Sequence, residues 1–341
     1  MTGSGARRAR VVVLGSSNTD MTVRLPRLPA RGQTMLGGAF LIGPGGKGAN
    51  QAVAARRAGA EVVFLTAVGD DDFGRRALDG YRREGIDVRH VRVLEGAPSG
   101  VALIFVDESG ENMIGVAPGA NALLTPEDVD RLPDSVFKGP GVFLASLEVP
   151  LATAAQGLRR AKAGGMIAVL NPAPVDYGLI ADDADILPLT DVLTPNHDEA
   201  LALAGVCLDT PMEALGAALA IRDFFGARDV IVTRGAEGCL VLSGADTFAV
   251  PAYPAEVVDT VGAGDAYNGA LAVALAEGRP LLDAAVWAAL AASLAVARPG
   301  AQAGLPFRAE IDRLAAAPHA APRPFDEYYR DYWSATSEGL P

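Results

Sequence analysis

Cysteine is nearly absent from this chain. Its 341 residues include only Cys207 and Cys239, which stand in unrelated settings. Neither belongs to a pattern with zinc-site spacing, and two isolated cysteines do not form a disulfide framework. The cysteine content therefore favours a reducing compartment, and we expect a cytoplasmic protein.

Excess positive charge and long hydrophobic runs are also lacking. Lys and Arg number 29 against 41 Asp and Glu, for a net charge of -12. Nonspecific nucleic-acid binding needs a basic surface, so we expect no nucleic-acid partner. The most apolar long segment, 281–297, contains Asp283 and falls short of the roughly 20 residues that a membrane span needs. It predicts a buried helix. The apolar run near the N-terminus is too short for a secretory signal, so we expect none.

What the chain does have is an alternation of short β-branched runs with alanine-rich segments of helical length. The expected strands are VVVLG (11–15), VVFLTAVG (62–69), GVFLA (141–145), MIAVLN (166–171), DVLTPN (191–196) and DVIVTRG (229–235). The expected helices include NQAVAARRAG (50–59), ATAAQGLRRAKAGG (152–165) and MEALGAALAIRDFFG (212–226). This rhythm predicts an α/β fold in which helices cover both faces of a parallel sheet.

Two stretches break the rhythm. Residues 20–42 and 99–117 show apolar alternation around turn sequences. They predict hairpins that form a small antiparallel sheet projecting from the main one. The last segment, 318–341, is proline-punctuated, acidic and aromatic, and its composition fits either a docked or a flexible tail. We therefore expect one domain over residues 10–317, followed by this tail.

A glycine-rich stretch, LIGPGGKGANQ (41–51), has the spacing G-x-G-x-x-G, with Asp70 at about the offset of a ribose-binding acid. In a dinucleotide fold these glycines directly follow the first strand. Here the first strand is followed by SSNTD (16–20), and the glycines come behind a hairpin. A P-loop would need Ser or Thr where Gly48 stands. An NAD-dependent oxidoreductase is therefore disfavoured.

A second glycine cluster carries more chemistry. Gly262, Ala263 and Gly264 are followed by Asp265 and then by an apolar-periodic helix. The first amides of a helix lack intrahelical partners, so such a turn can hold anionic oxygens. A carboxylate at this turn can accept the proton of an attacking hydroxyl during phosphoryl transfer. The alternative is that Asp265 only caps the helix.

Several segments together resemble one family. They are VVVLGSSNTD (11–20), GPGGKGANQAVAARRAGAEVVFLTAVGDDDFG (43–74) and DTVGAGDAYNGAL (259–271). The chain is identified by them as similar to the ribokinase-like (PfkB) sugar kinases, from about Val11 to about Leu314. Three further segments narrow the resemblance to members that phosphorylate ribose: 99–121, LNPAP (170–174) and TPNHDE (194–199). The resemblance implies a three-layer α/β/α sandwich with a mainly parallel sheet and a small β-lid.

The resemblance also implies the residues that bind the sugar. They are Asn18, Asp20, Gly46, Lys47, Asn50 and Glu148, with Asp265 as catalytic base. A carboxylate that accepts from two vicinal hydroxyls suits a polyol. The alternatives are an Asx turn at Asn18 and Asp20, a solvated lysine at Lys47, and an ordinary first-turn glutamate at Glu148.

On the nucleotide side, the resemblance implies ATP binding near Asn196, Glu199, Thr233, Gly235 and Gly264. Glu199 would hold Mg²⁺ through water, which suits an ion that keeps several waters. Asn196 and Glu199 also have capping-box spacing, and both roles are compatible. The Gly262–Gly264 turn would be the anion hole. An activating monovalent cation, typically K⁺, would be held by the loops of Asp259, Val261, Ala295, Arg298 and Gly300.

Some positions depart from the family pattern. Gly304 stands where a serine often ligates the cation, and Ala289 where a polar side chain often borders the adenine. Pro44 before the double glycine is also unusual. The activity implied is ATP-dependent phosphorylation of D-ribose at O5, by a homodimer joined through the lid. The alternatives are a kinase of deoxyribose, fructose or adenosine and, in another class, a non-catalytic sugar-binding protein.

Overall fold

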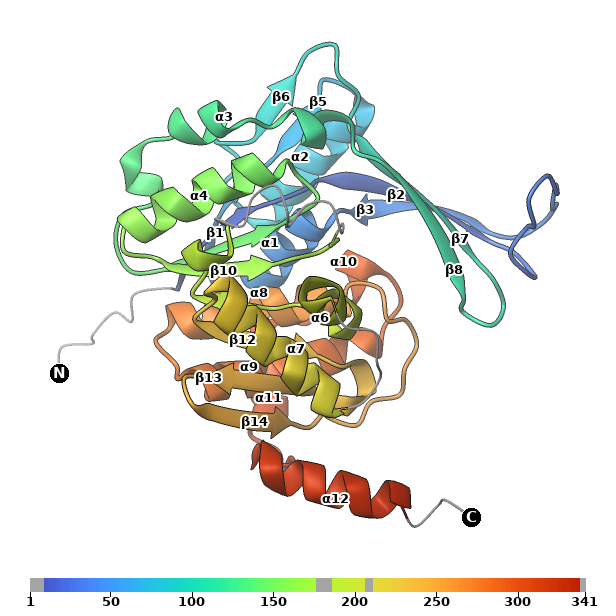
Figure 1. Ribbon diagram of the computed structural model, residues 1–341. Helices are drawn as coiled ribbons and strands as arrows, with labels where there is room; N and C mark the ends of the chain where they lie inside the picture. Colours follow the sequence, from blue (N-terminus) through green and yellow to red (C-terminus); the bar gives the residue numbers. More distant parts are fainter. Residues whose placement is uncertain (1–8, 176–185, 206–210, 338–341) are drawn as a thin grey trace.

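The computed structural model describes residues 9–175, 186–205 and 211–337. Cys207 lies outside these ranges, and Cys239 is a buried free thiol. Figure 1 shows a helix-covered body from which a long β-arm projects. Of the described helices, none is long and apolar enough to cross a membrane. The apolar segment that begins at Leu281 is the buried helix α9.

The main sheet has nine strands in the order β15-β14-β13-β12-β11-β10-β9-β1-β4. The strands from β4 to β12 run parallel, and β13, β14 and β15 are antiparallel to their neighbours. Their bounds are β1 Arg10–Leu14, β4 Glu61–Leu65, β9 Val142–Ser146, β10 Ile167–Asn171, β11 Val192–Leu193, β12 Asp229–Thr233, β13 Cys239–Ser243, β14 Asp246–Val250 and β15 Arg323–Pro324. The predicted mainly parallel sheet is confirmed.

Helices cover both faces of this sheet. Successive residues of β1 point to opposite faces, so Val11 and Val13 join the core cluster under α1, α8 and α9, whereas Val12 and Leu14 join the one under α4 and α7. The helices are α1 Lys47–Arg57, α2 Asp72–Glu84, α3 Pro126–Asp130, α4 Leu151–Ala163, α6 His197–Ala204, α7 Pro211–Phe225, α8 Ala263–Ala276, α9 Leu281–Val296, α10 Ala301–Gly304, α11 Arg308–Ala315 and α12 Phe325–Ser337. The three-layer prediction is confirmed.

The projecting arm is a sheet of order β3-β2-β7-β8, here called the lid. Its strands are β2 Asn18–Arg24, β3 Phe40–Gly45, β7 Gly100–Val106 and β8 Asn112–Ala117. Both predicted hairpins are confirmed, although β2 begins before residue 20 and β3 extends beyond residue 42. The prediction of a wholly antiparallel sheet is wrong, because the central pair, β2 and β7, is parallel. These two strands belong to different hairpins, so no turn fixes their relative direction.

Other differences are local. The run 62–69 is two strands and not one: β4 ends at Leu65, and β5, Ala67–Gly69, pairs with β6, Arg92–Leu94, in a separate sheet. The chain leaves the main sheet at Thr66, which is fully buried. The tail is docked as far as it is described, through β15 and α12 (Figure 1). The remaining short 3-10 turns are Gly119–Leu123, Asp134–Val136, Leu187–Leu189 and Gly235–Glu237.

Candidate active site

The residues singled out from the sequence gather at one end of the main sheet, where its parallel strands end. Asn18 follows β1, Glu148 follows β9 and Asn196 follows β11. The first turns of α1 and α8 reach the same edge, since Glu148 contacts the first residue of α1 and Asn50 of α1 contacts Asp265 of α8. This is the edge at which open α/β sheets bind their ligands.

Asp265 lies in the first turn of α8 and its carboxylate meets side chains from α1. The residue is only 8% exposed. Asn50 Nδ2 donates to its Oδ2 at 2.9 Å, and Gln51 Nε2 donates to its Oδ1 at 3.1 Å. The residue that caps α8 is Gly262, which offers no side chain. The alternative that Asp265 only caps its helix is therefore wrong.

The turn that precedes α8 leaves backbone donors at the helix N-terminus. Gly262 has a φ of 80°, in the left-handed region that glycine adopts readily. Ala263 N donates back to Thr260 O at 3.2 Å. Among the described residues, the amides of Gly264 and Asp265 find no backbone acceptor, as is usual in a first helical turn. A turn of this kind is suited to anionic oxygens.

Burial governs the charge state of the Asp265 carboxyl. Burial raises its pKa to about 6, while the Lys47 ammonium and the hydrogen bonds from Asn50 and Gln51 act in the opposite direction. The nearby Glu148 carboxylate raises it slightly further. A carboxylate with this pKa is ionised at neutral pH and is more basic than an exposed aspartate, which suits a general base.

The sequence analysis missed two polar side chains behind Asp265. Gln51 Nε2 donates to Asn171 Oδ1 at 3.0 Å as well as to Asp265, and Asn171 Nδ2 donates to Thr194 O at 2.9 Å. This chain ties α1 and α8 to the ends of β10 and β11. Asn171 stands in the LNPAP segment, so the resemblance drew attention to its position without giving it a role.

Lys47 begins α1 beside several carboxylates. Its backbone amide donates to Glu148 Oε2 at 3.1 Å, and the Ser16 hydroxyl donates to the same oxygen. Burial lowers the pKa of Lys47, but the charges of Asp265, Glu148 and Glu199 together raise it above its usual 10.5. The alternative of a solvated lysine is wrong. Glu148 lies in the loop after β9 and is not a first-turn residue of a helix.

Asn18 and Asp20 are strand residues of β2, so the alternative of an Asx turn is wrong. Asn18 is buried, and its Oδ1 accepts from Asn121 Nδ2 at 2.8 Å. Burial, followed by the charges of Glu148 and Asp265, raises the pKa of Asp20 to about 6. The Asp20 side chain therefore lies among the other acids of the site.

Three glycines of the stretch, Gly45, Gly46 and Gly48, serve close packing between β1, β2, β3 and α1, whereas a Cβ at Gly43 would meet nothing within 4 Å. A Cβ at Gly45 would lie 2.0 Å from Asp20 Oδ1, and one at Gly46 would lie 2.7 Å from Asn18 N. One at Gly48 would lie 2.4 Å from the carbonyl carbon of the residue that follows β1. These glycines therefore let the sugar-side residues and the start of α1 come together, a role unlike that of a pyrophosphate turn.

The predicted nucleotide residues lie along the ends of β11 and β12. Asn196 caps α6 in a capping box with Glu199, with both hydrogen bonds at 2.8 Å. Asn196 also forms a β-bridge with Thr233, and Gly235 follows in a tight turn with a φ of 55°. Burial raises the pKa of Glu199, against a hydrogen bond from the Asn196 amide and the charge of Lys47. The capping role is confirmed.

The predicted cation loops are joined through Asp259. Its Oδ1 accepts from Val261 N at 3.0 Å, and its Oδ2 accepts from Gly300 N at 2.9 Å. The Asp259 amide in turn donates to Val296 O at 3.1 Å. The carboxylate thus holds the loop before α8 against the loop after α9.

Carbonyl groups from the end of α9 and from the loop after it converge on Gly304. A Cβ at Gly304 would lie 3.1 Å from Ala295 O and 3.2 Å from Arg298 O. Backbone carbonyls that share one small space are the kind of ligand that a hard cation takes. A serine at this position would add a hydroxyl to the two carbonyls, and glycine adds none. The donor set therefore fits a monovalent cation, with fewer ligands than the family pattern supplies.

Two buried oxygen atoms beside Asp265 have no partner among the described residues: Asn50 Oδ1 and Gln51 Oε1. Both belong to amides whose nitrogens donate to Asp265. A buried acceptor without a donor is costly, so it marks a place where a ligand or water donates. Hydroxyl groups of a polyol would satisfy these atoms.

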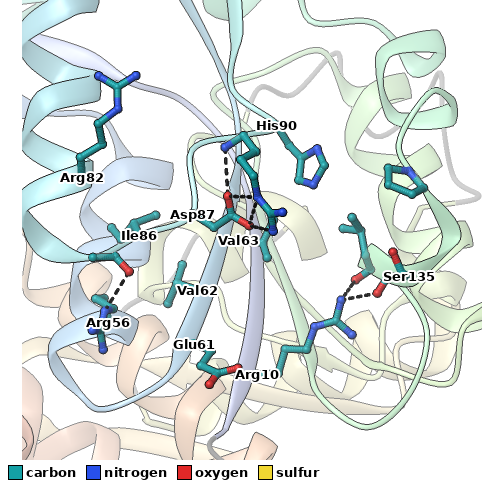
Figure 2. A pocket seen from close by; sticks show the side chains of 14 residues that line it. Arg10, Arg56, Glu61, Val62, Val63, Arg82, Ile86, Asp87, His90 and Ser135 are labelled. Carbon is teal, nitrogen blue, oxygen red and sulfur yellow. Dashed lines mark hydrogen bonds and ion pairs between the residues drawn. The ribbon is translucent and has the colours of Figure 1, made fainter.

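A large cavity lies at the other end of β1, with a volume of about 690 Å³. Figure 2 shows Arg56, whose guanidinium donates to the carbonyl of residue 85, and Asp87 on the lining of this cavity. Asp87 pairs with Arg89 at 2.7 Å. Arg10 and Glu61, which begin β1 and β4, also line it. None of the predicted site residues does, so the cavity is separate from the site at the strand ends.

Comparisons with known proteins agree with this geometry. Residues 8–308 match the pfkB family of carbohydrate kinases. A ribokinase from Haemophilus influenzae is 36% identical over 303 residues, which cover 89% of this chain and 97% of the relative. A deoxyribokinase from Salmonella typhi is also 36% identical, over 296 residues that cover 87% of this chain and 95% of the relative. The structure of Arabidopsis thaliana ribokinase complexed with ribose and ATP has a TM-score of 0.80, with 29% identity over 92% of this chain and 100% of that chain.

Proposed function

This chain belongs to the pfkB family of carbohydrate kinases, and we propose that it transfers the γ-phosphoryl group of ATP to the O5 hydroxyl of D-ribose. The product is D-ribose 5-phosphate. Support for the acceptor comes from the ribokinase relatives, one of whose structures holds ribose and ATP. The observation that carries the reaction is the buried Asp265 carboxylate, which lies at the first turn of α8 and has a pKa raised to about 6.

Asp265 accepts the proton of the primary hydroxyl as the hydroxyl attacks the γ-phosphorus. The amides of the Gly262–Gly264 turn hold the phosphoryl oxygens, and the Lys47 ammonium offsets part of the charge. Asn18, Asp20, Asn50 and Glu148 bind the sugar hydroxyls. In-line transfer of this kind depends chiefly on positioning, so these contacts act by orienting the hydroxyl.

The charge balance of the site supports a requirement for Mg²⁺. Glu148, Glu199 and Asp265 lie around the Lys47 ammonium, and Asp20 lies near Glu148 and Asp265. This excess of negative charge disfavours a polyphosphate. Mg²⁺ would supply positive charge that neutralises part of the charge on the phosphate groups. Glu199 would hold it through water. Asn196, Thr233 and Gly235 would line the nucleotide.

We also propose that K⁺ binds between the two loops joined by Asp259. Its ligands would be carbonyls of Val261, Ala295, Arg298 and Gly300, with Asp259 positioning both loops. The convergence of two of these carbonyls at Gly304 supports the site. We expect K⁺ to stimulate turnover. Because glycine at position 304 contributes no hydroxyl ligand, we expect K⁺ to bind weakly.

The lid would close over the sugar and also join two copies of the chain. Its exposed apolar side chains include Phe40, Leu41, Ile42, Leu103, Met113, Ile114 and Val116. A twisted sheet with open edges and this apolar surface is a common site of pairing. We therefore propose a cytoplasmic homodimer with a kinase domain over 10–317 and an accessory tail over 318–341.

One assay tests the function. ADP release is measured with ribose, deoxyribose, fructose and adenosine as acceptors, each with and without K⁺. We expect the largest kcat/KM with ribose. Higher kcat/KM with adenosine or fructose would contradict the assignment of the acceptor, and no ADP release with any acceptor would favour the non-catalytic alternative.

Deoxyribose is the second candidate, because a deoxyribokinase relative is as similar to this chain as the ribokinase. The two sugars differ at the 2-hydroxyl. If the Asp20 carboxylate accepts from that hydroxyl, its loss leaves a buried carboxylate without a donor, which is strongly unfavourable. We therefore expect kcat/KM to be clearly lower with deoxyribose than with ribose.

A further inference from the structure

The tail is the part of the chain that the family match does not reach, since the match ends at residue 308. Its described part contains β15 and α12. β15 pairs antiparallel with Phe248 and Ala249 of β14, and Figure 1 shows α12 beyond that strand at the end of the body. Without the tail, β14 would be the open edge of the main sheet. The tail therefore covers the edge of the main sheet that β14 would otherwise leave open.

Aromatic packing anchors the tail. Phe325, the first residue of α12, is 4% exposed and belongs to the core cluster on the α4 and α7 face. Its ring centroid lies 6.3 Å from that of Tyr328 and 5.9 Å from that of Tyr329. Arg323 and Asp331 form an ion pair at 2.8 Å within the tail. Burial of this aromatic side chain favours the docked position of α12.

The anchored helix reaches the turn that follows β12. Arg234 Nη1 donates to the Tyr328 hydroxyl at 3.5 Å, and the same guanidinium pairs with Glu237. The Arg234 side chain is only 10% exposed, so these partners are needed to keep its charge satisfied. The Arg234 amide also donates to Gly238 O at 2.8 Å, which closes the turn. Tyr328 thus braces the turn from outside.

A second contact of the tail lies on the other side of the sheet edge. His319 and Ala320 line a cavity of about 20 Å³ together with Tyr253, Val286 and Ala289. The space holds about one water molecule. Tyr253 stands in the loop between β14 and the turn before α8, and Ala289 stands on α9. The tail therefore covers this small space between the Tyr253 loop and α9.

We propose that the tail is a built-in positioning element of the nucleotide site, which holds the Arg234–Gly238 turn through Tyr328. The ligand is the ADP or ATP of the proposed function. This inference rests on the proposed function for the assignment of that turn to the nucleotide. Tyr328 acts as a positioning residue through Arg234. The tail contacts described above are made with β14, Arg234 and the space beside Ala289, away from the sugar-side residues Asp20, Lys47 and Asn50. We therefore expect ribose binding to be independent of the tail.

The test uses the full chain, a chain that ends at Ala317, and the single variants Phe325→Ala and Tyr328→Phe. Dissociation constants for ADP and for ribose are measured separately by calorimetry, with melting temperatures in parallel. We expect the shortened chain and Phe325→Ala to bind ADP about three- to tenfold more weakly, and Tyr328→Phe less so, with ribose binding within about twofold of the full chain. Phe325→Leu, which keeps an apolar anchor, should restore ADP binding.

Arg323→Ala is the matched control, because it breaks the ion pair with Asp331 inside the tail without touching Arg234. It should leave ADP binding unchanged. Unchanged ADP binding in a folded shortened chain or in folded Phe325→Ala would overturn the proposal, as would an equal loss of ADP and ribose binding. If the full chain binds ADP but shows no ribose-dependent turnover, the proposed function is refuted. The comparison of ADP binding between the full chain and the tail variants would still be valid.

Discussion

At the residue scale, the site depends on how its buried carboxylates are kept ionised. Asp265 is surrounded by donors from α1, and the positive charge of Lys47 limits the rise that burial gives to its pKa. The sequence could indicate Asp265 and Asn50, because each stands in a recognisable motif. Gln51 stands in the same motif as Asn50, but the motif gave it no role, because its contact with Asp265 depends on how two helices pack.

The first prediction concerns the base. Asp265→Asn should lower kcat by about a hundred- to ten-thousand-fold, the usual worth of a general base, while ribose still binds. The fold should survive, because the unpartnered oxygens of Asn50 and Gln51 allow either amide to turn and accept from the new Asn side chain. Steady-state kinetics and calorimetry with ribose check this. Asp283→Asn, at an exposed acid of α9, is the control, and near-normal turnover of the Asp265 variant would refute the assignment.

The second prediction concerns pH. kcat/KM should fall as pH drops through about 6, because Asp265 and Asp20 then become protonated and Asp265 no longer accepts a proton. In Lys47→Met the charge that lowers the pKa of Asp265 is gone, so the acid limb should move above 6. Profiles of kcat/KM against pH, recorded for the unchanged protein and for Lys47→Met, measure the position of the acid limb in each. Lys138→Met, at an exposed lysine, should leave the limb in place, and an unmoved limb in Lys47→Met would disprove the coupling.

At the element scale, the site is a product of the contact between α1 and α8. The apolar periodicity of both helices was readable from the sequence, and so were the hairpins of the lid. The direction in which β2 pairs with β7 was not readable, because it is decided by long-range contacts between separate hairpins. The antiparallel strands β13 and β14 were also not foreseen, although they carry the sheet on to the edge that the tail covers.

The third prediction tests this helix contact. A Cβ at Gly269 of α8 would lie 2.4 Å from Ala54 Cβ and 2.9 Å from Gln51 O. Gly269→Ala should therefore push the helices apart, at a cost of about 1–3 kcal/mol in the free energy of unfolding. Because Gln51 and Asn50 then lose their alignment with Asp265, kcat should fall as well.

Thermal unfolding and steady-state kinetics measure the two effects. The control is Gly216→Ala in α7, where nothing lies within 4 Å of the added Cβ. Since alanine is the better helix former, that variant should keep its activity and gain a little stability. Equal melting temperatures and equal kcat for the two variants would show that the close contact has no role.

At the scale of the whole molecule, the amino-acid composition of the tail did not decide whether the tail is docked. Its aromatic and acidic residues fitted docking and flexibility equally well in the sequence. Docking is decided by whether Phe325 finds an apolar recess and whether β14 offers a free edge, and both are properties of the folded body. The net charge argued against nucleic acid as a partner. The partner that the lid would bind depends on the apolar surface of the lid, which forms only when the chain folds.

The last prediction concerns that surface. β8 forms one edge of the lid and is exposed along its whole length, with Met113 52% and Ile114 53% exposed. Adjacent strand residues point to opposite faces, so the double variant Met113→Asp with Ile114→Asp places a charge on each face of the edge. If two lids pack together, burying these charges is unfavourable and the protein should become monomeric, as sedimentation velocity would detect.

Val93→Asp, at a similarly exposed apolar residue of β6, should stay dimeric, since β6 lies outside the lid sheet. A wild-type monomer, or an unchanged sedimentation coefficient in the double variant, would rule out a dimer through this edge of the lid.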